Sequence, residues 1–137
     1  MTVATVLEKS GVLAALEPAL ASRMVSGLAY DSRLAKEDNL FFAFPGARTD
    51  GRRFAADAYE KGALAVVSEL PQPYDIAGPW IQVAHGRKAL AAASKIFFGA
   101  PDERLFVAAI TGTNGKTTTS WLVDSILRSA GFRTSEN

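Results

Sequence analysis

The sequence contains no cysteine and only one histidine, His85. The lack of cysteine excludes disulfide bonds, thiol catalysis and cysteine-ligated metals, and one histidine cannot form a metal-binding cluster or supply a histidine-dependent triad within this chain. His85 lies just before a predicted helix, where a turn or capping role explains it better than catalysis. Any chemistry carried by this chain must therefore use other residue types.

Long apolar runs and an excess of one charge are also missing. Fifteen basic and fourteen acidic side chains give a formal net charge of +1, without a basic block, so the charge pattern indicates neither nucleic acid nor an anionic membrane as a partner. No stretch approaches membrane-spanning length, and the first residues lack the features of a secretory signal. We therefore expect a cytoplasmic protein that binds a small molecule. Its 137 residues, 48% of them hydrophobic, suffice for a hydrophobic core.

A glycine-rich segment with one lysine, T-G-T-N-G-K-T-T-T, occupies residues 111–119. Residues 105–110 before it are apolar without alternation, which predicts a short buried strand, and apolar residues at helical spacing follow over 117–130. The segment therefore lies where a strand meets a helix. The generic nucleotide-loop pattern requires a glycine where Ile110 stands, so the match is to a narrower form of that pattern.

Each residue type in this loop suits phosphate binding. Backbone N–H groups near Gly112 and Gly115 can converge on phosphate oxygens, and the start of the following helix attracts anions. Lys116 adds a mobile full charge for the outer phosphates, and the hydroxyl of Thr117 is suited to ligate magnesium. A tight turn with a capping threonine would explain the glycines alone, but the Lys-Thr pair at the helix start favours phosphate binding.

Strand-like and helical patterns alternate over the first hundred residues. Strands are expected over 25–30, 39–44, 63–67 and 80–83, and helices over 3–16 (one or two short helices), 54–59 and 87–98. This alternation predicts an α/β fold with a small mixed or parallel sheet covered by helices. Helix-ending and charged residues over 99–104 predict a linker. It would separate a domain over 1–98 from the first strand, phosphate loop and helix of an incomplete P-loop ATPase domain over 105–137.

Two loops at predicted strand ends, 30–33 and 46–53, carry polar residues without an evident structural purpose. Ser32 offers a hydroxyl, Arg33 offers a planar fork for a diphosphate or carboxylate, and Thr49 can hold a ribose or a base edge. The guanidinium of Arg48 provides a second planar fork for a diphosphate or carboxylate. Such a set fits an anionic nucleotide sugar.

Ordinary turns are the alternative explanation of both loops. In that case Asp31 and Asp50 would accept local backbone hydrogen bonds while the arginines are solvated. The residues themselves leave both possibilities open.

The segment from Gly27 to Val67 resembles the N-terminal domain of the Mur ligases. The resemblance lies in Y-D-S-R, D-N-L-F-F-A-F-P-G, D-G-R-R-F and A-Y-E-K-G-A-L-A-V-V, and with the phosphate loop it covers essentially the whole chain in the expected order. It implies an ATP-dependent amide ligase of peptidoglycan synthesis with three domains, which bind the uridine nucleotide, ATP and the incoming amino acid. In such ligases ATP phosphorylates the substrate carboxylate, and the amino group then attacks the acyl phosphate.

The resemblance also implies roles for individual residues. Tyr30 and Ser32 match positions that contact the UDP-sugar, and a second substrate-contacting loop matches Ala47, Arg48 and Thr49. The implied ATP-binding residues are Gly112, Thr113, Asn114, Gly115, Lys116, Thr117 and Thr118, with Lys116 as the catalytic residue and Thr117 as the ligand of Mg²⁺. The amino-acid pocket would lie on a domain that this chain lacks, so the chain alone is expected to be inactive.

Within the family, a loop that runs G-K-T-T-T favours the branch that adds the third residue of the stem peptide, with UDP-N-acetylmuramoyl-L-alanyl-D-glutamate as substrate. Two alternatives stay open: the branch that adds the D-Ala-D-Ala dipeptide, and a truncated, non-catalytic module that binds a nucleotide sugar. Folylpolyglutamate synthases share T-G-T-N-G-K but typically continue with Gly-Ser, and they lack the uridine-binding domain.

Overall fold

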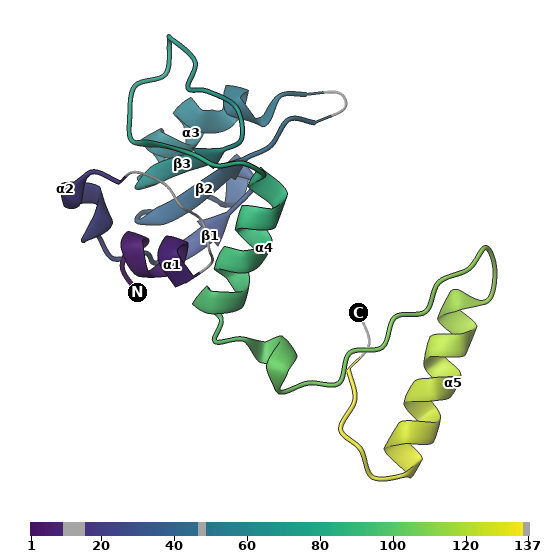
Figure 1. Ribbon diagram of the computed structural model, residues 1–137. Helices are drawn as coiled ribbons and strands as arrows, with labels where there is room; N and C mark the ends of the chain where they lie inside the picture. Colours follow the sequence, from purple (N-terminus) through teal and green to yellow (C-terminus); the bar gives the residue numbers. More distant parts are fainter. Residues whose placement is uncertain (10–15, 47–48, 136–137) are drawn as a thin grey trace. The chain divides into compact units, whose positions relative to one another are not determined.

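The computed structural model describes residues 1–9, 16–46 and 49–135, and the chain divides into two compact units, Met1–Arg104 and Leu105–Asn137 (Figure 1). Among the described residues, no helix is both long enough and apolar enough to span a bilayer. The first unit holds a parallel sheet between helices, as the alternating pattern predicts. The second unit holds one long helix and extended chain.

The sheet of the first unit has four parallel strands in the order β1-β2-β3-β4. The strands are β1 (Gly27–Ala29), β2 (Asn39–Ala43), β3 (Ala65–Ser68) and β4 (Trp80–Gln82). Leu40 lies opposite both Leu28 and Ala65, and Val67 lies opposite Ile81. Every residue of β2 and β3 is buried, which explains why these strands are apolar without alternation. All four predicted strands are confirmed.

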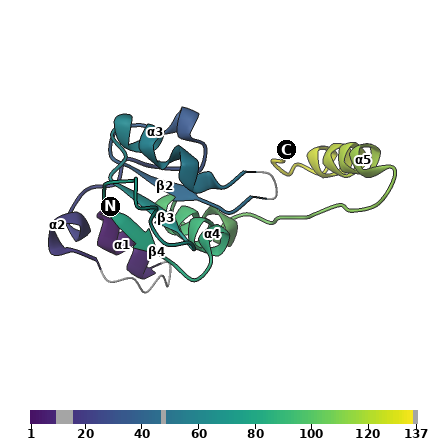
Figure 2. The same cartoon turned by 90° about the horizontal axis from the view of Figure 1, so that it is seen from above.

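Helices cover both faces of the sheet. They are α1 (Val3–Lys9), α2 (Pro18–Ala21), α3 (Ala55–Glu60) and α4 (Gly86–Phe97), with 3₁₀ turns η1 (Ser32–Leu34), η2 (Gly51–Phe54) and η3 (Pro101–Glu103). Figure 2 shows α3 on one side of the sheet and α1 and α4 on the other. Connections between neighbouring parallel strands are right-handed. Because the four strands follow one another in sequence order, all of these connections pack on the same face of the sheet. The helices before and after the sheet cover the other face.

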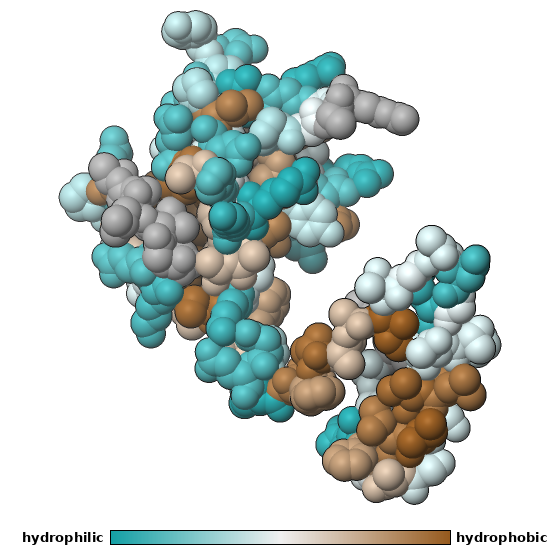
Figure 3. Space-filling model, turned by 45° about the vertical axis from the view of Figure 1, so that its right-hand side comes forward, coloured by the Kyte–Doolittle hydropathy of each residue, from teal (hydrophilic) through white to brown (hydrophobic). Residues whose placement is uncertain are grey.

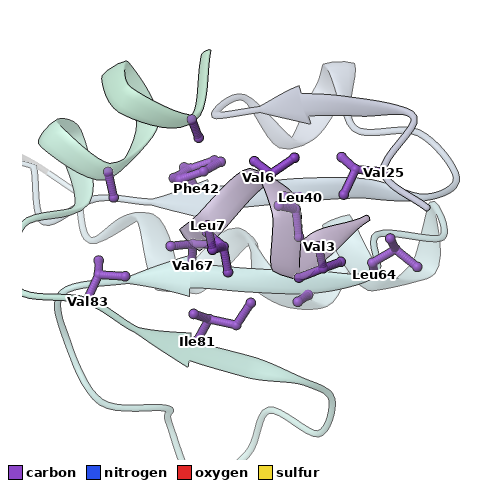
Figure 4. Packing of buried hydrophobic residues seen from close by; sticks show 13 residues of the cluster. Val3, Val6, Leu7, Val25, Leu40, Phe42, Leu64, Val67, Ile81 and Val83 are labelled. Atoms are coloured by element: carbon purple, nitrogen blue, oxygen red, sulfur yellow. The ribbon is translucent and has the colours of Figure 1, made fainter. Parts of the chain in front are cut away.

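Alternating side chains of the central strands divide the core into two parts. Leu40 and Phe42 point toward α1 and α4, where they pack with large aliphatic side chains (Figure 4). Phe41 points to the opposite face, as expected for adjacent residues in a strand. The second cluster is built largely from small side chains: Ala29, Ala35, Ala43, Ala55, Ala58 and Ala63, with Phe41 and Val66.

One helix begins outside the predicted ranges, and the end of another is confirmed. Pro18 begins α2, a short helix outside the predicted ranges, because the first helical position needs no N–H and favours the fixed φ of proline. The middle of the predicted helix over 3–16 falls on residues 10–15, outside the described residues. Gly62 has φ 88° and follows Lys61, the C-cap residue of α3, as expected of a glycine that ends a helix.

The segment over 99–104, predicted as a linker, is folded and belongs to the first unit. Lys95, in the last turn of α4, forms ion pairs with Asp102 at 2.8 Å and Glu103 at 2.9 Å. The N–H of Ala100 donates to the carbonyl of Lys95 at 2.7 Å. Gly99 and Ala100 both adopt left-handed backbone conformations, and this reverses the chain so that η3 folds back against the end of α4.

In the second unit, α5 (Lys116–Ser129) confirms the predicted helix, but the strand predicted over 105–110 does not form. A parallel strand requires a neighbouring strand as hydrogen-bond partner, and none is present among the described residues of this unit. Residues 105–110 are exposed, as are Trp121, Leu122 and Ile126 of α5. Figure 3 shows the apolar surface that results on this unit.

Candidate functional site

The loops that follow the four strands meet at the carboxyl edge of the sheet, because all strands run in one direction. Open parallel sheets of α/β proteins bind ligands at this edge. The loop after β1 contains Tyr30 and leads into η1, and the loop after β2 leads through residues 44–50 into η2. Both polar loops singled out in the sequence therefore lie at the edge where a ligand is expected.

The η1 turn is closed by Asp31, which caps it with its side chain. The Oδ1 atom accepts the backbone N–H of Arg33 at 3.0 Å, and the guanidinium of Arg33 donates to both carboxylate oxygens at 2.6–3.1 Å. These hydrogen bonds from Arg33 lower the pKa of Asp31 from 3.8 to about 2. The arginine that the sequence suggested as a fork for an anionic ligand is therefore already paired with its neighbour.

Ser32 is a polar residue with an available hydroxyl inside a tightly held turn. The residue is only 6% exposed, and its hydroxyl hydrogen-bonds to none of the described residues. No buried side-chain oxygen or nitrogen among them lacks a partner, so the Ser32 hydroxyl must reach solvent. Ser32 borders an open hollow of about 510 Å³, whose other lining residues are Tyr30, Asp31, Arg33 and Phe54. The hydroxyl of Ser32 can thus donate a hydrogen bond to a ligand or accept one from it, beside the aromatic side chains of Tyr30 and Phe54.

In the loop after β2, an aspartate again caps a 3₁₀ turn and pairs with the arginine two residues later. Asp50 caps η2 by accepting the backbone N–H of Arg52 at 2.9 Å, and it pairs with the guanidinium at 2.7 Å. The hydrogen bond from the Arg52 side chain lowers the pKa of Asp50. Arg52 also donates to the carbonyl of Pro71 at 2.9 Å, so it joins the loop after β2 to the loop after β3. Local hydrogen bonds to both aspartates, which the turn interpretation predicted, are confirmed.

The loop between Gly46 and Gly51 is narrow. The N–H of Gly46 donates to the carbonyl of Thr49 at 3.1 Å, and the N–H of Gly51 donates to the carbonyl of Phe44 at 2.8 Å. A Cβ at Gly51 would lie 2.7 Å from backbone atoms of Phe44, so only glycine fits there. Thr49 is exposed and does not line the hollow. Ala47 and Arg48 lie outside the described residues.

Glu69, which follows β3, connects this strand end to the start of α4, which follows β4. Its Oε2 accepts the buried N–H of Gly86, the first residue of α4, at 2.7 Å. His85 is the N-cap residue of α4, in line with the turn or capping role expected for it, but its side chain makes no capping hydrogen bond and Glu69 supplies that bond instead. Next to this contact the guanidinium of Arg87 lies 4.8 Å from the centre of the Phe44 ring.

The phosphate loop of the second unit has the backbone that its glycines predict. Gly115 is the N-cap of α5 with φ 75°, and Gly112 has φ 153°, conformations that favour glycine. The helix start has no side-chain cap, so its first N–H groups are available to an anion. Lys116 reaches back across the loop, where Nζ donates to the carbonyl of Gly112 at 2.7 Å.

The loop residues fit a phosphate group better than they define a metal site. No described residues form a group of histidine and acidic side chains that could hold a metal ion. The Thr117 hydroxyl makes no hydrogen bond among them and offers one oxygen ligand. Thr113, Asn114 and Thr118 are exposed around the same loop.

The part of the chain that forms the sheet matches a known protein family. Residues 24–98, which include the whole sheet, match the sequence model described as Mur ligase family, catalytic domain. The chain belongs to the Mur ligase family. It is 62% identical over 116 residues to the UDP-N-acetylmuramoyl-L-alanyl-D-glutamate–2,6-diaminopimelate ligase of Solibacter usitatus, a match that covers 85% of this chain and 24% of that ligase.

Other Mur ligases show the same relationship. The equally named ligase of Aquifex aeolicus is 47% identical over 112 residues, which are 82% of this chain and 23% of that protein. The chain thus spans about a quarter of the length of the curated relatives it matches.

Solved Mur ligases share the fold. A crystal structure of MurF from Acinetobacter baumannii superposes with a TM-score of 0.68 at 26% identity, covering 93% of this chain and 27% of that one. MurF ligase from Thermotoga maritima in complex with ADP gives a TM-score of 0.54 at 26% identity, covering 74% and 23%.

Among the residues implied by the resemblance, Tyr30 and Ser32 border one hollow, whereas Thr49 lies on a neighbouring loop. Sequence reasoning missed the two aspartate–arginine pairs, although the repeated spacing D-S-R and D-G-R was a signal for them. It also missed Lys61, which donates to the carbonyl of Ser32 at 2.6 Å. No local pattern indicates that contact, because 29 residues separate its partners.

Proposed function

We propose that the chain is part of an ATP-dependent amide ligase that adds the third amino acid to UDP-N-acetylmuramoyl-L-alanyl-D-glutamate in peptidoglycan synthesis. The solvent-accessible hydroxyl of Ser32, in an otherwise buried residue that borders the hollow, is the observation that carries this proposal. The names of the most similar relatives support the choice of the family branch. ATP and UDP-linked precursors are cytoplasmic compounds, which supports a cytoplasmic location.

The first unit would bind the UDP-sugar. The Ser32 hydroxyl can both donate and accept a hydrogen bond, and Tyr30 and Phe54 offer aromatic surface beside it. Thr49, with Ala47 and Arg48 on the same loop, would contact the substrate from the next strand end. The paired aspartates fix the backbone of the two turns, so the contacting groups are positioned before the substrate arrives.

The second unit would bind ATP with Mg²⁺ through its phosphate loop. When bound, ATP supplies the phosphoryl group that activates the substrate carboxylate. The free N–H groups at the start of α5 would hold phosphate oxygens, Lys116 would neutralise charge that develops on the leaving oxygens, and Thr117 would ligate Mg²⁺. Loss of one such preorganised donor costs about 2.7–4 kcal/mol of transition-state stabilisation, which is the effect expected of Lys116→Met in a complete ligase.

A titration of the 137-residue chain with UDP-N-acetylmuramoyl-L-alanyl-D-glutamate tests the substrate site. Ser32→Ala should weaken binding about tenfold, the equivalent of one hydrogen bond of about 1.4 kcal/mol, without lowering the thermal midpoint. Ser94→Ala is the matched control, because Ser94 lies on α4 and lines no part of the hollow. Absence of binding by the unchanged chain would refute the proposal.

A second titration with Mg-ATP tests the other unit. We expect weak binding, because residues 105–110 form no strand and the apolar side chains of α5 are exposed. Tight binding of Mg-ATP by this chain would contradict the view that the nucleotide domain is incomplete.

The D-Ala-D-Ala-adding branch is the second candidate, because solved MurF structures share the fold. A protein extended to the length of the relatives would distinguish the two branches. Turnover of the UDP-linked dipeptide with a free amino acid supports the first branch. Turnover of the UDP-linked tripeptide with D-Ala-D-Ala supports the second.

A further inference from the structure

The carbonyl of Ser32 is held by a lysine from a different element. Lys61 lies directly after α3, and its Nζ donates to this carbonyl at 2.6 Å. The same carbonyl also accepts the N–H of Ala35, but at 3.3 Å. The charge-assisted bond from Lys61 is therefore the shorter of the two bonds that hold the backbone of Ser32.

The backbone of Lys61 is itself fixed. Gly62 follows it with φ 88°, and its carbonyl accepts the N–H of Asp38 at 2.9 Å. A Cβ at Gly62 would lie 3.0 Å from the Cα of Glu37, so the end of α3 packs closely on the segment between η1 and β2. The fixed backbone of Lys61 therefore anchors the side chain whose ammonium group reaches the η1 turn.

We propose that Lys61 is a positioning residue for substrate binding, which holds the η1 turn so that the Ser32 hydroxyl faces the UDP-sugar. This inference rests on the proposed function of the first unit. Lys61 is exposed and does not line the hollow, so it acts through the turn and not by touching the substrate. The positive charge of its ammonium also stabilises the ionised form of Asp31, the cap of the same turn.

Without Lys61, the turn keeps the cap from Asp31 and the 3.0 Å bond from the N–H of Leu34 to the carbonyl of Asp31, but the carbonyl of Ser32 keeps only the 3.3 Å bond from Ala35. The Ser32 backbone can then adopt other orientations, and the substrate must select the productive one. Binding weakens by the fraction of molecules in that orientation. The core of the unit does not include Lys61, so its fold should be retained.

The test is a double-mutant cycle on the 137-residue chain, read by calorimetric titration with UDP-N-acetylmuramoyl-L-alanyl-D-glutamate. Lys61→Met should weaken binding about tenfold, which corresponds to about 1.4 kcal/mol, and Lys61→Arg should restore most of the affinity. Because Lys61 acts through Ser32, the double variant should bind about as weakly as Ser32→Ala alone. Titrations are run at a temperature at which circular dichroism shows every variant to be folded.

Lys9→Met is the matched control for charge, because Lys9 is exposed at the end of α1 on the other face of the sheet. It should leave the dissociation constant unchanged. The proposal is overturned if Lys61→Met binds like the unchanged chain, or if the effects of Lys61→Met and Ser32→Ala simply multiply. A chain that does not bind the UDP-sugar at all would instead refute the proposed function, so the two failures are distinct.

Discussion

The contact between Glu69 and α4 permits a quantitative prediction. Gly86 is buried, and its N–H has the Glu69 carboxylate as partner at 2.7 Å. A buried N–H left without a partner costs about 1–3 kcal/mol, and a lost helix cap costs about 1 kcal/mol. These values describe the same loss and are not added. Because Glu69 is half-exposed and water can partly replace it, we expect Glu69→Ala to lower the free energy of unfolding by about 1.5 kcal/mol.

Glu69→Gln separates the hydrogen bond from the charge. The amide oxygen of glutamine still accepts the N–H of Gly86, but the favourable interaction of a negative charge with the helix N-terminus, about 0.3–1 kcal/mol, is lost. The glutamine variant should therefore lose about a third to a half of what the alanine variant loses. Added salt should narrow the gap between the unchanged chain and Glu69→Gln, because screening weakens the charge interaction.

Thermal unfolding followed by tryptophan fluorescence measures the effect in the first unit. The chain has two tryptophans, and Trp121 lies in the second unit. In a Trp121→Phe background the signal comes from Trp80, whose ring N–H donates to the carbonyl of Leu70 at 3.1 Å. A loss of about 1.5 kcal/mol should lower the midpoint by about 6–12 °C for a unit of this size.

Glu60→Ala, at the exposed end of α3, is the control and should leave the midpoint unchanged. If Glu69→Ala unfolds at the same temperature as the unchanged chain, Glu69 is not the cap of α4. If the alanine and glutamine variants lose equal stability, the hydrogen bond contributes nothing beyond the charge.

Three further predictions concern single groups. Hydrogen bonds from Arg33 lower the pKa of Asp31 from 3.8 to about 2, so the stability that the Asp31 carboxylate contributes is present above pH 3.8 and is lost as the pH falls to about 2. The thermal unfolding midpoints of the unchanged chain and of Asp31→Asn should therefore converge over this pH range. A constant difference between the two midpoints would contradict the pairing. Ala100 has φ 50°, so Ala100→Gly should stabilise the first unit by about 0.5–1 kcal/mol in denaturant titrations, whereas Ala91→Gly within α4 should destabilise it by about 0.5–1 kcal/mol. Burial raises the pKa of Tyr59 to about 12, so the phenolate absorbance that Tyr59→Phe removes should have its midpoint there, and a midpoint near 10 would refute it.

The sheet was predictable because burial of its central strands requires a recognisable apolar sequence pattern. Residues 39–43 and 65–68 are buried on both faces, and such strands must be apolar at nearly every position. The end of α4 was equally visible, since Gly99 and Pro101 follow it. The same reasoning was wrong for residues 105–110. Their apolar sequence is suited to a buried strand, but a strand forms only where a neighbour supplies hydrogen bonds.

The candidate site was predictable in its location and not in its contacts. Parallel strands bring residues 30–33 and 46–53 to one edge, and sequence order is enough to infer this. The roles within the edge depend on side chains that are distant in sequence. Glu69 caps a helix that begins 17 residues later, and Lys61 holds a carbonyl 29 residues earlier. Neither contact follows from local spacing, because it depends on how closely α3 and α4 approach the sheet.

The layer of alanines under α3 has a consequence for the reach of Lys61. Ala55 and Ala58 have no exposed surface, and they belong to the same core cluster as Ala29, Ala35 and Ala43. Small side chains on both surfaces let the helix axis lie close to the strands. A bulkier residue such as valine at position 58 would thicken this layer and move the end of α3 outward. The spacing at which the lysine ammonium meets the carbonyl of Ser32 is thus set by methyl groups buried in the core.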